Sequence, residues 1–263
     1  MIAIGERING KWNDVKKAIN SKDAGIIHAL ARAQTECGAS FLDINVGTAT
    51  ADKVSAMRWL VEEVEKAVDT PIAIDSQNLE VVRAGLAASR KNKKMINSTS
   101  GDPEKLASWL PLAAEHDASI IALTMDKEGI AQTVDRRIEI AATIVTSAME
   151  QGVEMDHLFI DPVMFPLSAS QEQPSILLQA ISQIKLICDP APHIVVGLSN
   201  VSNGCTERPL LNRTFLVMAI AAGLDSAIVD VEDEELMNAA IAAEVMLNKQ
   251  LYSASFLRAG RIR

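Results

Sequence analysis

The sequence predicts a single-domain α/β protein with the (β/α)8 fold, a TIM barrel that spans residues 1–263. Three observations predict this fold: eight short apolar runs, helical patterns between them, and a length that is typical of one such barrel. Most of the apolar runs stop abruptly at a polar residue. In a parallel barrel, polar groups at the carboxyl ends of strands point into the mouth, where ligands bind.

Each apolar run is short enough to be one strand of the predicted sheet. The runs and the residues that end them are 2–4 with Glu6, 41–42 with Asp43 and Asn45, 72–74 with Asp75, 95–96 with Asn97, 120–123 with Thr124, 158–160 with Asp161, 194–198 with Ser199 and Asn200, and 227–229 with Asp230. The almost uninterrupted apolar run at 194–198 indicates a strand that is buried on both faces.

Helical patterns separate the runs. Apolar residues recur at helical spacing, or helix-start and helix-stop signals appear, in the segments 24–37, 53–68, 79–88, 103–116, 133–150, 174–188, 209–222 and 234–248. Asp23 is a good N-cap, Pro103, Pro174 and Pro209 suit first turns, and Gly38, Gly152 and Gly223 suit helix ends. This alternation predicts an all-parallel sheet. An open doubly wound sheet would carry a GxGxxG fingerprint after its first strand, and residues 5–10 do not match it.

Composition excludes several classes of protein. The chain is 48% hydrophobic and only 3% aromatic, so we expect a core of small and branched side chains. Its net charge of −9 argues against binding to nucleic acid or to anionic membrane surfaces. No apolar run approaches the ~20 residues of a spanning helix, and the N-terminus lacks the pattern of a signal peptide. We therefore expect a cytoplasmic protein with no membrane partner.

The cysteines and histidines predict no metal site. Cys37, Cys188 and Cys205 are far apart and odd in number, and they show no CxxC or Cys/His spacing. The four histidines are isolated from one another. Three reduced and mostly buried thiols are the expected state.

Three strand-ending residues are candidates for a ligand site. Asp75, Asn97 and Asp161 end different predicted strands, and closure of the barrel would bring their side chains to one pocket. A carboxylate accepts two hydrogen bonds side by side, and an amide offers one donor and one acceptor. Together they suit a flat heterocycle with an amino-pyrimidinone edge. Helix capping is the alternative interpretation for each residue taken alone.

The segment from Gly197 to Gly204 follows the seventh predicted strand. Barrels commonly bind phosphate in the loops after strands seven and eight. This segment contains Gly, Ser and Asn but no Lys, so it fits an uncharged polar ring better than a phosphate. A plain turn is the alternative interpretation. Asn200, where the strand is expected to end, is its least turn-like position.

Several segments closely resemble the pterin-binding methyltransferases, and in particular the methyltetrahydrofolate:corrinoid/iron–sulfur-protein methyltransferases. They are Gly5-Glu6-Arg7-Ile8-Asn9, Asp43-Ile44-Asn45-Val46-Gly47, Asp75-Ser76, Ile96-Asn97-Ser98, Asp161-Pro162 and Gly197-Leu198-Ser199-Asn200-Val201-Ser202. The resemblance runs over the whole chain. It implies a (β/α)8 barrel, a homodimer, tetrahydrofolate or 5-methyltetrahydrofolate as substrate, and a corrinoid (cobalamin) carried by a separate protein.

The resemblance also implies roles for individual residues. Asp75, Asn97 and Asp161 would hold the pterin, and Gly197 and Ser199 would contact it from the loop. Asn200 would hydrogen-bond near N5 of the folate. Asn203 and Arg208 are further expected folate contacts, and Arg208 would pair with the glutamate tail unless it is a surface residue at a helix start. Glu6, Asn9, Asp43 and Asn45 either line the pocket or brace the barrel mouth.

The chemistry of N5 fits a catalytic amide at Asn200. The anionic form of N5 is a very poor leaving group, so a donor that strengthens its hydrogen bond as N5 gains electrons speeds transfer. One such preorganised donor contributes about 10²–10³ in rate. The alternatives are a dihydropteroate synthase-like enzyme, which would need clustered Lys and Arg for pyrophosphate, and a non-catalytic folate-binding module. The sequence does not choose the direction of methyl transfer.

Overall fold

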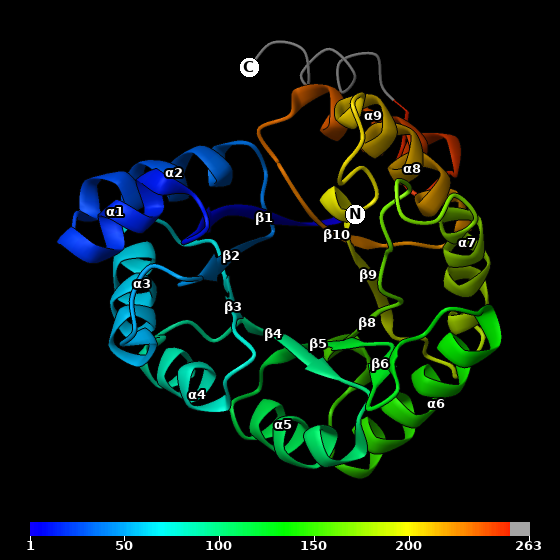
Figure 1. Ribbon diagram of the computed structural model, residues 1–263, viewed down its shortest axis with the longest axis horizontal. Coiled ribbons are helices and arrows are strands. Elements are labelled where there is room, and N and C mark those ends of the chain that lie inside the picture. The colour runs from blue at the N-terminus through cyan, green and yellow to red at the C-terminus, as the bar shows by residue number, and fades with distance from the viewer. Residues whose placement is uncertain (253–263) are drawn as a thin grey trace.

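The computed structural model describes residues 1–252, and it confirms the predicted (β/α)8 barrel (Figure 1). Eight parallel strands close on themselves in the order β1-β10-β9-β8-β5-β4-β3-β2. They are β1 (Ile2–Asn9), β2 (Phe41–Asn45), β3 (Ile72–Asp75), β4 (Lys94–Ser100), β5 (Ser119–Leu123), β8 (Leu158–Asp161), β9 (His193–Gly197) and β10 (Ser226–Val229). A short antiparallel hairpin, β6 (Met125–Asp126) and β7 (Gly129–Ile130), follows β5.

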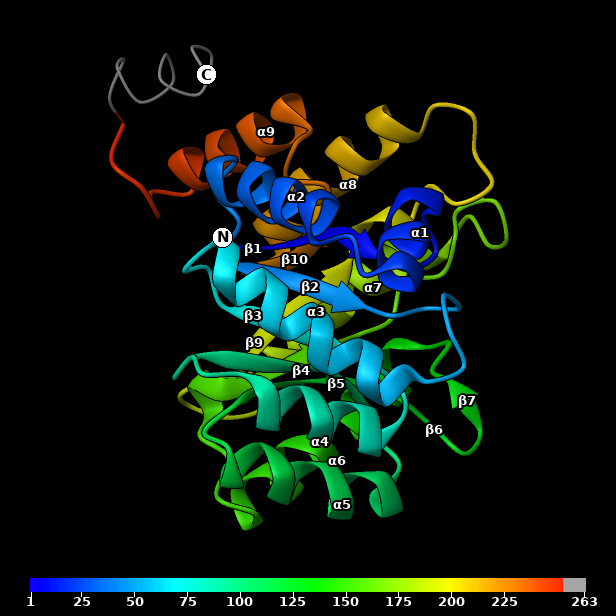
Figure 2. The same cartoon turned by 90° about the vertical axis from the view of Figure 1, so that its left-hand side faces the viewer.

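The helices form a ring outside the barrel (Figures 1 and 2). They are α1 (Asn13–Ser21), α2 (Ala24–Glu36), α3 (Lys53–Ala67), α4 (Leu79–Ala88), α5 (Pro103–Glu115), α6 (Val134–Glu150), α7 (Gln173–Ile184), α8 (Arg208–Ala222) and α9 (Glu234–Met246). Two short 3₁₀ turns, η1 (Met155–His157) and η2 (Leu198–Asn200), flank β8 and β9. None of the helices within residues 1–252 is long and apolar enough to cross a membrane.

The predicted helix signals mark the observed boundaries well. The Asp23 carboxylate accepts a hydrogen bond from the Gly25 N–H at 3.0 Å, and Gly223 ends α8 at φ 114°. The three proline signals lie in the first turns of α5, α7 and α8. Some details of the prediction are wrong: the helix expected to reach 188 ends at Ile184, and β1 continues past Glu6. Helix α1 and the β6–β7 hairpin were not predicted.

Two apolar cores lie on opposite sides of the barrel wall. The larger one fills the space between the strands and the helix ring. The smaller one plugs the barrel interior, and seven strands contribute one residue each: Ile4, Phe41, Ala73, Met95, Ile121, Phe159 and Val195. Because strand side chains alternate with a period of two, the residue two positions later faces the same interior. Those next interior positions include Asp43, Asp75, Asn97 and Asp161, so the polar residues stand directly above the plug.

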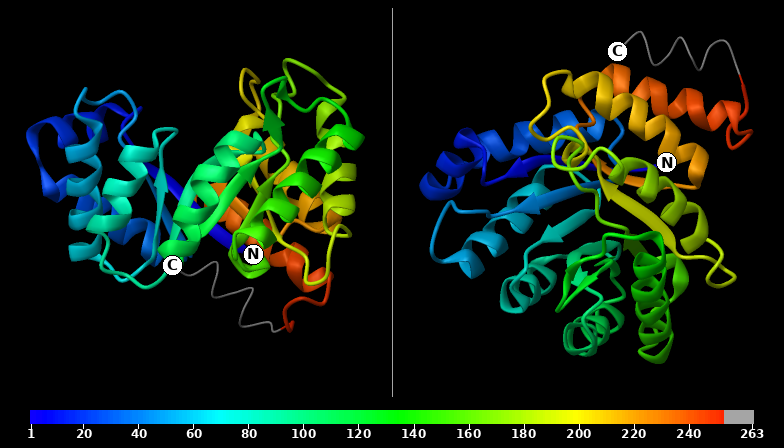
Figure 3. Two further views of the ribbon diagram at one scale, coloured as in Figure 1. Left: turned by 90° about the horizontal axis from the view of Figure 1, so that it is seen from below. Right: turned by 45° about the vertical axis from the view of Figure 1, so that its right-hand side comes forward.

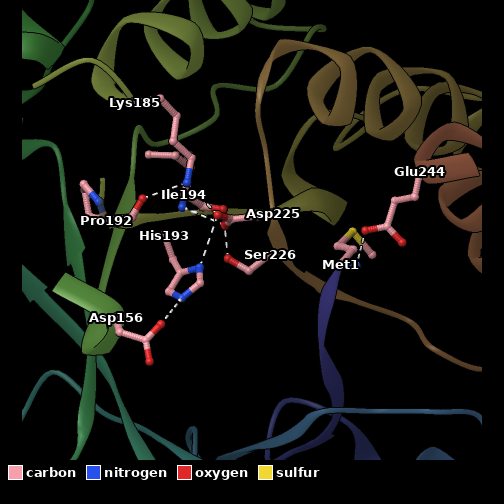
Figure 4. A network of polar contacts seen from close by, with 9 residues as sticks. All are labelled: Met1, Asp156, Lys185, Pro192, His193, Ile194, Asp225, Ser226 and Glu244. Atoms are coloured by element: carbon pink, nitrogen blue, oxygen red, sulfur yellow. Dashed lines mark hydrogen bonds and ion pairs between the residues drawn. The ribbon is translucent and has the colours of Figure 1, made fainter. Parts of the chain in front are cut away.

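The amino end of the barrel carries a network of charged groups around Asp225 (Figure 4). The Asp225 carboxylate accepts hydrogen bonds from Lys185 Nζ at 2.6 Å, His193 Nδ1 at 3.2 Å and the Ile194 N–H at 2.9 Å. The other nitrogen of His193 contacts Asp156 at 3.4 Å. The Met1 ammonium pairs with Glu244 nearby. These contacts join the start of β9, the segment before β10 and the end of α7 at the amino end of the barrel.

Replacing Asp225 by Ala should lower the free energy of unfolding by about 2 kcal/mol, because several hydrogen bonds to charged groups are lost. The hydrogen bond to Asp225 raises the pKa of His193, so this contribution is complete below pH 6.5 and is lost as pH rises through the folded-state pKa. Burial by itself would raise the pKa of Asp225, but the hydrogen bonds from His193 and Lys185 outweigh it and lower that pKa. The stability that the ionised Asp225 carboxylate contributes is therefore lost below about pH 4.

Urea unfolding of both proteins between pH 4 and pH 9 checks this expectation. The stability difference should be largest between about pH 4 and 6.5 and should narrow at higher pH. A pH-independent difference would contradict the ionic account. Asp69→Ala is the control, since the exposed Asp69 carboxylate forms a surface ion pair with Lys91.

Candidate active site

The structure brings the predicted ring-holding residues to the carboxyl end of the barrel. Asp75 and Asp161 are the last residues of β3 and β8, and Asn97 lies inside β4. Asp75 and Asn97 are register partners on adjacent strands, and only β5 separates β4 from β8. Asn97 and Asp161 are each 8% exposed. Asn97 and Asp161 are therefore largely withdrawn from water, and Asp75 on the same arc of the mouth is half-buried.

Strand β2 supplies two further polar groups to this arc. The Asn45 amide donates from Nδ2 to the Asp75 carboxylate at 2.5 Å and accepts from the Gly47 N–H at 2.6 Å. The Asn97 amide donates from Nδ2 to Asp43 Oδ1 at 2.9 Å. Asp43 is only 3% exposed and contacts Asp75 as well. Strand β2 thus braces two of the predicted ligand groups.

Burial controls the charge of the three carboxyl groups. It raises the pKa of Asp161 to about 7, against the opposing effects of the Val163 N–H and Arg137. It also raises the pKa of Asp75, although hydrogen bonds from Asn45 and Asp43 favour the ionised form. Burial and the nearby charge of Asp75 raise the pKa of Asp43 well above its usual range. Asp161 therefore changes charge near neutral pH.

The segment after Asp161 is held in an unusual conformation. Val163 has φ +58°, a region that β-branched residues rarely adopt, and its N–H donates to Asp161 Oδ1 at 2.8 Å. The buried guanidinium of Arg137 donates to the Pro162 carbonyl at 2.7 Å and to Gln173 Oε1 at 2.9 Å. Arg137 from α6 and Gln173 from α7 thus clamp the backbone that orients Asp161.

The loop after β9 lies on the same side of the mouth as β1, because only β10 separates the two strands. Ser199 Oγ donates to Glu6 Oε1 at 2.7 Å, so a predicted residue of this loop contacts a predicted residue of β1. Asn200 is exposed in η2, and its Nδ2 lies 3.0 Å from the position that a Cβ on Gly197 would take. A larger residue at Gly197 would therefore crowd the Asn200 amide. Asn200 belongs to the turn after β9, and the strand itself ends at Gly197.

The structure gives Arg208 and Asn203 different surroundings from one another. Arg208, at the first position of α8, donates to Ser202 Oγ at 3.1 Å and to the Ser199 carbonyl at 3.1 Å. The exposed Arg208 side chain therefore ties α8 to the loop after β9. The Asn203 carbonyl accepts from Ser168 Oγ at 2.6 Å. This bond joins the loops after β8 and β9, whose ribbons can be followed in Figure 3. The Asn203 residue is itself exposed.

A cavity of about 290 Å³ opens beside the mouth, between β1, the loop after β9, α8 and the segment after β10. Its wall carries two basic residues, Lys11 and Arg208, and three acidic ones, Glu6, Asp230 and Asp233. The wall is therefore net acidic. Ser199 lines this cavity, whereas Asp75, Asn97 and Asp161 do not. The cavity is therefore a recess separate from the arc of Asp75, Asn97 and Asp161.

Sequence inspection missed or left open three contributors to the site. Arg137 has no sequence signal, because it follows Arg136 in an ordinary helical pattern. Asp43 and Asn45 had a signal: they lie two and four positions after Phe41, on the same interior face of β2. Among residues 1–252, no group of three or more His, Cys, Asp and Glu is placed to hold a metal ion.

The mouth of the barrel presents buried carboxylates and an amide from neighbouring strands, and these groups can form hydrogen bonds with a flat heterocycle. Comparison with known proteins identifies the class to which the chain belongs. Residues 6–230 match the model of the pterin-binding enzymes, and the chain belongs to this family.

Individual relatives agree with this assignment. The chain is 35% identical, over its full length and 98% of the relative, to a methylcorrinoid:tetrahydrofolate methyltransferase of Eubacterium limosum. It is 33% identical to methionine synthase of Mycobacterium tuberculosis, where the match covers 87% of this chain and 20% of that longer protein. The dihydropteroate synthase of Coxiella burnetii, solved with pteroic acid, has the same fold, with a TM-score of 0.69, 14% identity and 94% coverage of both chains.

Asp161→Asn should separate the ligand-binding role of this carboxyl group from its effect on stability. With a folded-state pKa of about 7, Asp161 favours folding below pH 3.8, and this contribution is lost as pH rises through 7. The amide variant should therefore be more stable than the parent at pH 8, by about 1 to 3 kcal/mol, yet bind tetrahydrofolate about tenfold or more weakly.

Urea unfolding and calorimetric titration between pH 6 and pH 8 provide both measurements. The affinity of the parent for tetrahydrofolate should weaken as pH falls below 7, and the affinity of the variant should not show this dependence on pH. Unchanged affinity in the variant would contradict a role for the Asp161 carboxylate in holding the ring.

Proposed function

We propose that this protein is a methyltransferase that moves a methyl group between N5 of tetrahydrofolate and the cobalt of a corrinoid carried by a separate protein. The arc of Asp75, Asn97 and Asp161 carries the proposal. Its carboxylate oxygens and amide carbonyl are hydrogen-bond acceptors, and the amino-pyrimidinone edge of a pterin presents adjacent N–H donors. Membership of the pterin-binding family and the full-length likeness to the Eubacterium limosum enzyme support the same ligand.

Asn200 is the proposed catalytic residue. In this proposal, the pterin edge anchored on the β3–β4–β8 arc leaves N5 on the side of the loop after β9, where Asn200 lies. An amide that donates to N5 forms a stronger bond as N5 gains electron density, so in the direction in which N5 is the leaving group it favours the transition state over bound 5-methyltetrahydrofolate. Gly197 serves this role by leaving room for the Asn200 amide. The corrinoid supplies the cobalt that accepts or gives up the methyl group, so no protein nucleophile is required.

The same groups serve both directions of transfer. When the methyl group moves to tetrahydrofolate, the N5 lone pair would form the bond to carbon, the cobalt would keep the electron pair of the broken cobalt–carbon bond, and N5 would lose its proton. The reverse reaction needs N5 to regain that proton as the methyl group leaves. We propose transfer from a methylated corrinoid protein to tetrahydrofolate as the physiological direction, on the strength of the name of the full-length relative.

A dihydropteroate synthase activity is the second candidate, because solved synthases share the fold. At their sequence identities of 14–16%, this likeness concerns the fold alone. That reaction releases pyrophosphate, which favours a basic recess. The cavity beside the mouth contains Lys11 and Arg208 but also Glu6, Asp230 and Asp233. Its net acidic wall disfavours pyrophosphate, so we rank methyl transfer first and a non-catalytic folate-binding module third.

The proposal includes two protein partners in the cytoplasm. A corrinoid protein must reach the mouth, where Asn200 is exposed. A second copy of the chain would form the homodimer expected from the family resemblance. Exposed apolar side chains on α8 and at the end of α9 offer a surface for it: Leu210, Val217, Met218, Met246 and Leu247. In this proposal Arg208 and Asn203 contact the outer part of the folate.

Methyl transfer is tested directly by mixing the purified protein, under anaerobic conditions, with tetrahydrofolate and methylcobalamin, or with 5-methyltetrahydrofolate and reduced cobalamin. The visible absorbance of the corrinoid should change in both mixtures, with a rate proportional to enzyme concentration. No change in either mixture, in protein that binds tetrahydrofolate, would leave the binding module as the function. Product formed from 4-aminobenzoate would favour the synthase.

Asn200→Ala should reduce turnover by about 10² or more while tetrahydrofolate affinity changes by less than about tenfold, because the lost bond is strongest in the transition state. Stopped-flow absorbance and calorimetric binding separate the two effects. Asn92→Ala, a change of an exposed amide before β4 at the opposite end of the barrel, is the matched control. A variant that binds poorly but turns over normally when saturated would refute the catalytic role.

A further inference from the structure

Strand β2 contains a buried carboxyl group that the proposed mechanism does not yet use. Asp43 is 3% exposed, accepts a hydrogen bond from Asn97 Nδ2 at 2.9 Å, and contacts the carboxyl group of Asp75. Two positions later, Asn45 donates to Asp75 at 2.5 Å. Thus both β2 side chains contact residues that we assign to the pterin, and the sequence left open whether Asp43 and Asn45 line the pocket or brace the mouth.

The proton count of the Asp43–Asp75 pair follows from its burial. Two carboxylates in contact and largely removed from water cannot both be ionised at neutral pH, so one of them keeps a proton. Their surroundings choose which one. Asp75 accepts from the Asn45 amide and lies in the field of Lys11, and both favour its charged form. Asp43 is more deeply buried and lies in the field of Glu6, and both favour its neutral form.

We propose that Asp43 and Asn45 are positioning residues of the folate site, and that Asp43 acts as a neutral carboxylic acid that donates to Asp75 and accepts from Asn97. This inference rests on the proposed function and deepens it. The Asp43 carbonyl oxygen receives the Asn97 amide, and its hydroxyl donates to Asp75. Asn45 holds Asp75 through a second donor and is itself fixed by the Gly47 N–H.

This bracing sets what the site recognises. Since the Nδ2 end of Asn97 is bound to Asp43, its carbonyl oxygen is the end presented to a ligand. Asp75 is held ionised and therefore only accepts. Two adjacent acceptors select a ring edge with adjacent N–H donors, such as a 2-amino-4-oxo-pyrimidine. A flip of the Asn97 amide would present a donor instead and would oppose that edge.

Asp43→Asn and Asp43→Ala distinguish a neutral acid from a charged one. An Asn side chain reproduces both bonds of the protonated carboxyl group, because its oxygen accepts from Asn97 and its amide donates to Asp75. We expect Asp43→Asn to bind tetrahydrofolate within about threefold of the parent, and Asp43→Ala to bind about tenfold to a hundredfold more weakly. This rescue by the amide is not expected of a residue that only fills space.

Asn45→Asp tests the second brace. It replaces the donor to Asp75 by a second negative group, so we expect affinity for tetrahydrofolate to fall about tenfold or more. The expected change lies in Kd and KM, with kcat at saturation reduced by less than about tenfold, because the chemistry at N5 involves Asn200. Asn92→Asp, at the exposed amide before β4, adds the same charge at the opposite end of the barrel; it is the charge-matched control and should match the parent.

The measurements are anaerobic calorimetry with tetrahydrofolate, steady-state kinetics with methylcobalamin, and thermal unfolding of each variant. Asp43→Asn binding as weakly as Asp43→Ala would overturn the neutral-acid role, and parent-like binding by Asp43→Ala and Asn45→Asp would overturn the positioning role. If Asp43→Ala does not fold, the affinities of Asp43→Asn and Asn45→Asp are compared instead. The proposal requires near-parent binding by the first variant and weaker binding by the second. Failure of the parent protein to bind tetrahydrofolate would refute the proposed function itself, which distinguishes the two failures.

Discussion

The period of two along each strand, imposed inside a closed barrel, is the constraint on which the rest of the structure depends. It gives every strand an interior row of side chains. The lower members of these rows, such as Phe41, Ala73 and Met95, form an apolar plug. The next members, Asp43, Asp75 and Asn97, must then occupy the same interior one step higher. The position of the polar groups directly above the apolar plug is therefore a direct result of strand geometry.

The apolar plug determines the electrostatics of the site above it. A carboxyl group above an apolar plug loses water on one side, and burial accordingly raises the pKa of Asp43, Asp75 and Asp161. Such groups reduce the stability of the folded chain above their pKa values. The opposite end of the barrel has the reverse arrangement, because Lys185 and His193 compensate the charge of Asp225. The uncompensated buried carboxyl groups and the compensated charge network thus lie at opposite ends of the barrel.

The sequence predicts the barrel well because its signals are local and repeated. Each signal acts over a few residues, whether it is an apolar run, an N-cap such as Asp23 or a first-turn proline. Such signals do not depend on contacts between distant residues, so the elements form where the signals predict them. Helix α1 was missed because it is short and polar, and the β6–β7 hairpin because its strands have two residues each. The arc of Asp75, Asn97 and Asp161 was predicted from strand ends. The contacts of Asp43 with Asn97, and of Arg137 with the segment after Asp161, join residues far apart in the chain. Those contacts depend on barrel closure and leave no local pattern.

A crystal structure of the protein with bound tetrahydrofolate tests the central claim most directly, because it locates the ring and N5 together. The amino-pyrimidinone edge should lie on Asp75, Asn97 and Asp161, with N5 within hydrogen-bond reach of the Asn200 amide. A ring bound instead in the recess lined by Trp12 and Arg208, with N5 remote from Asn200, would contradict the assignment of the site and of its catalytic residue.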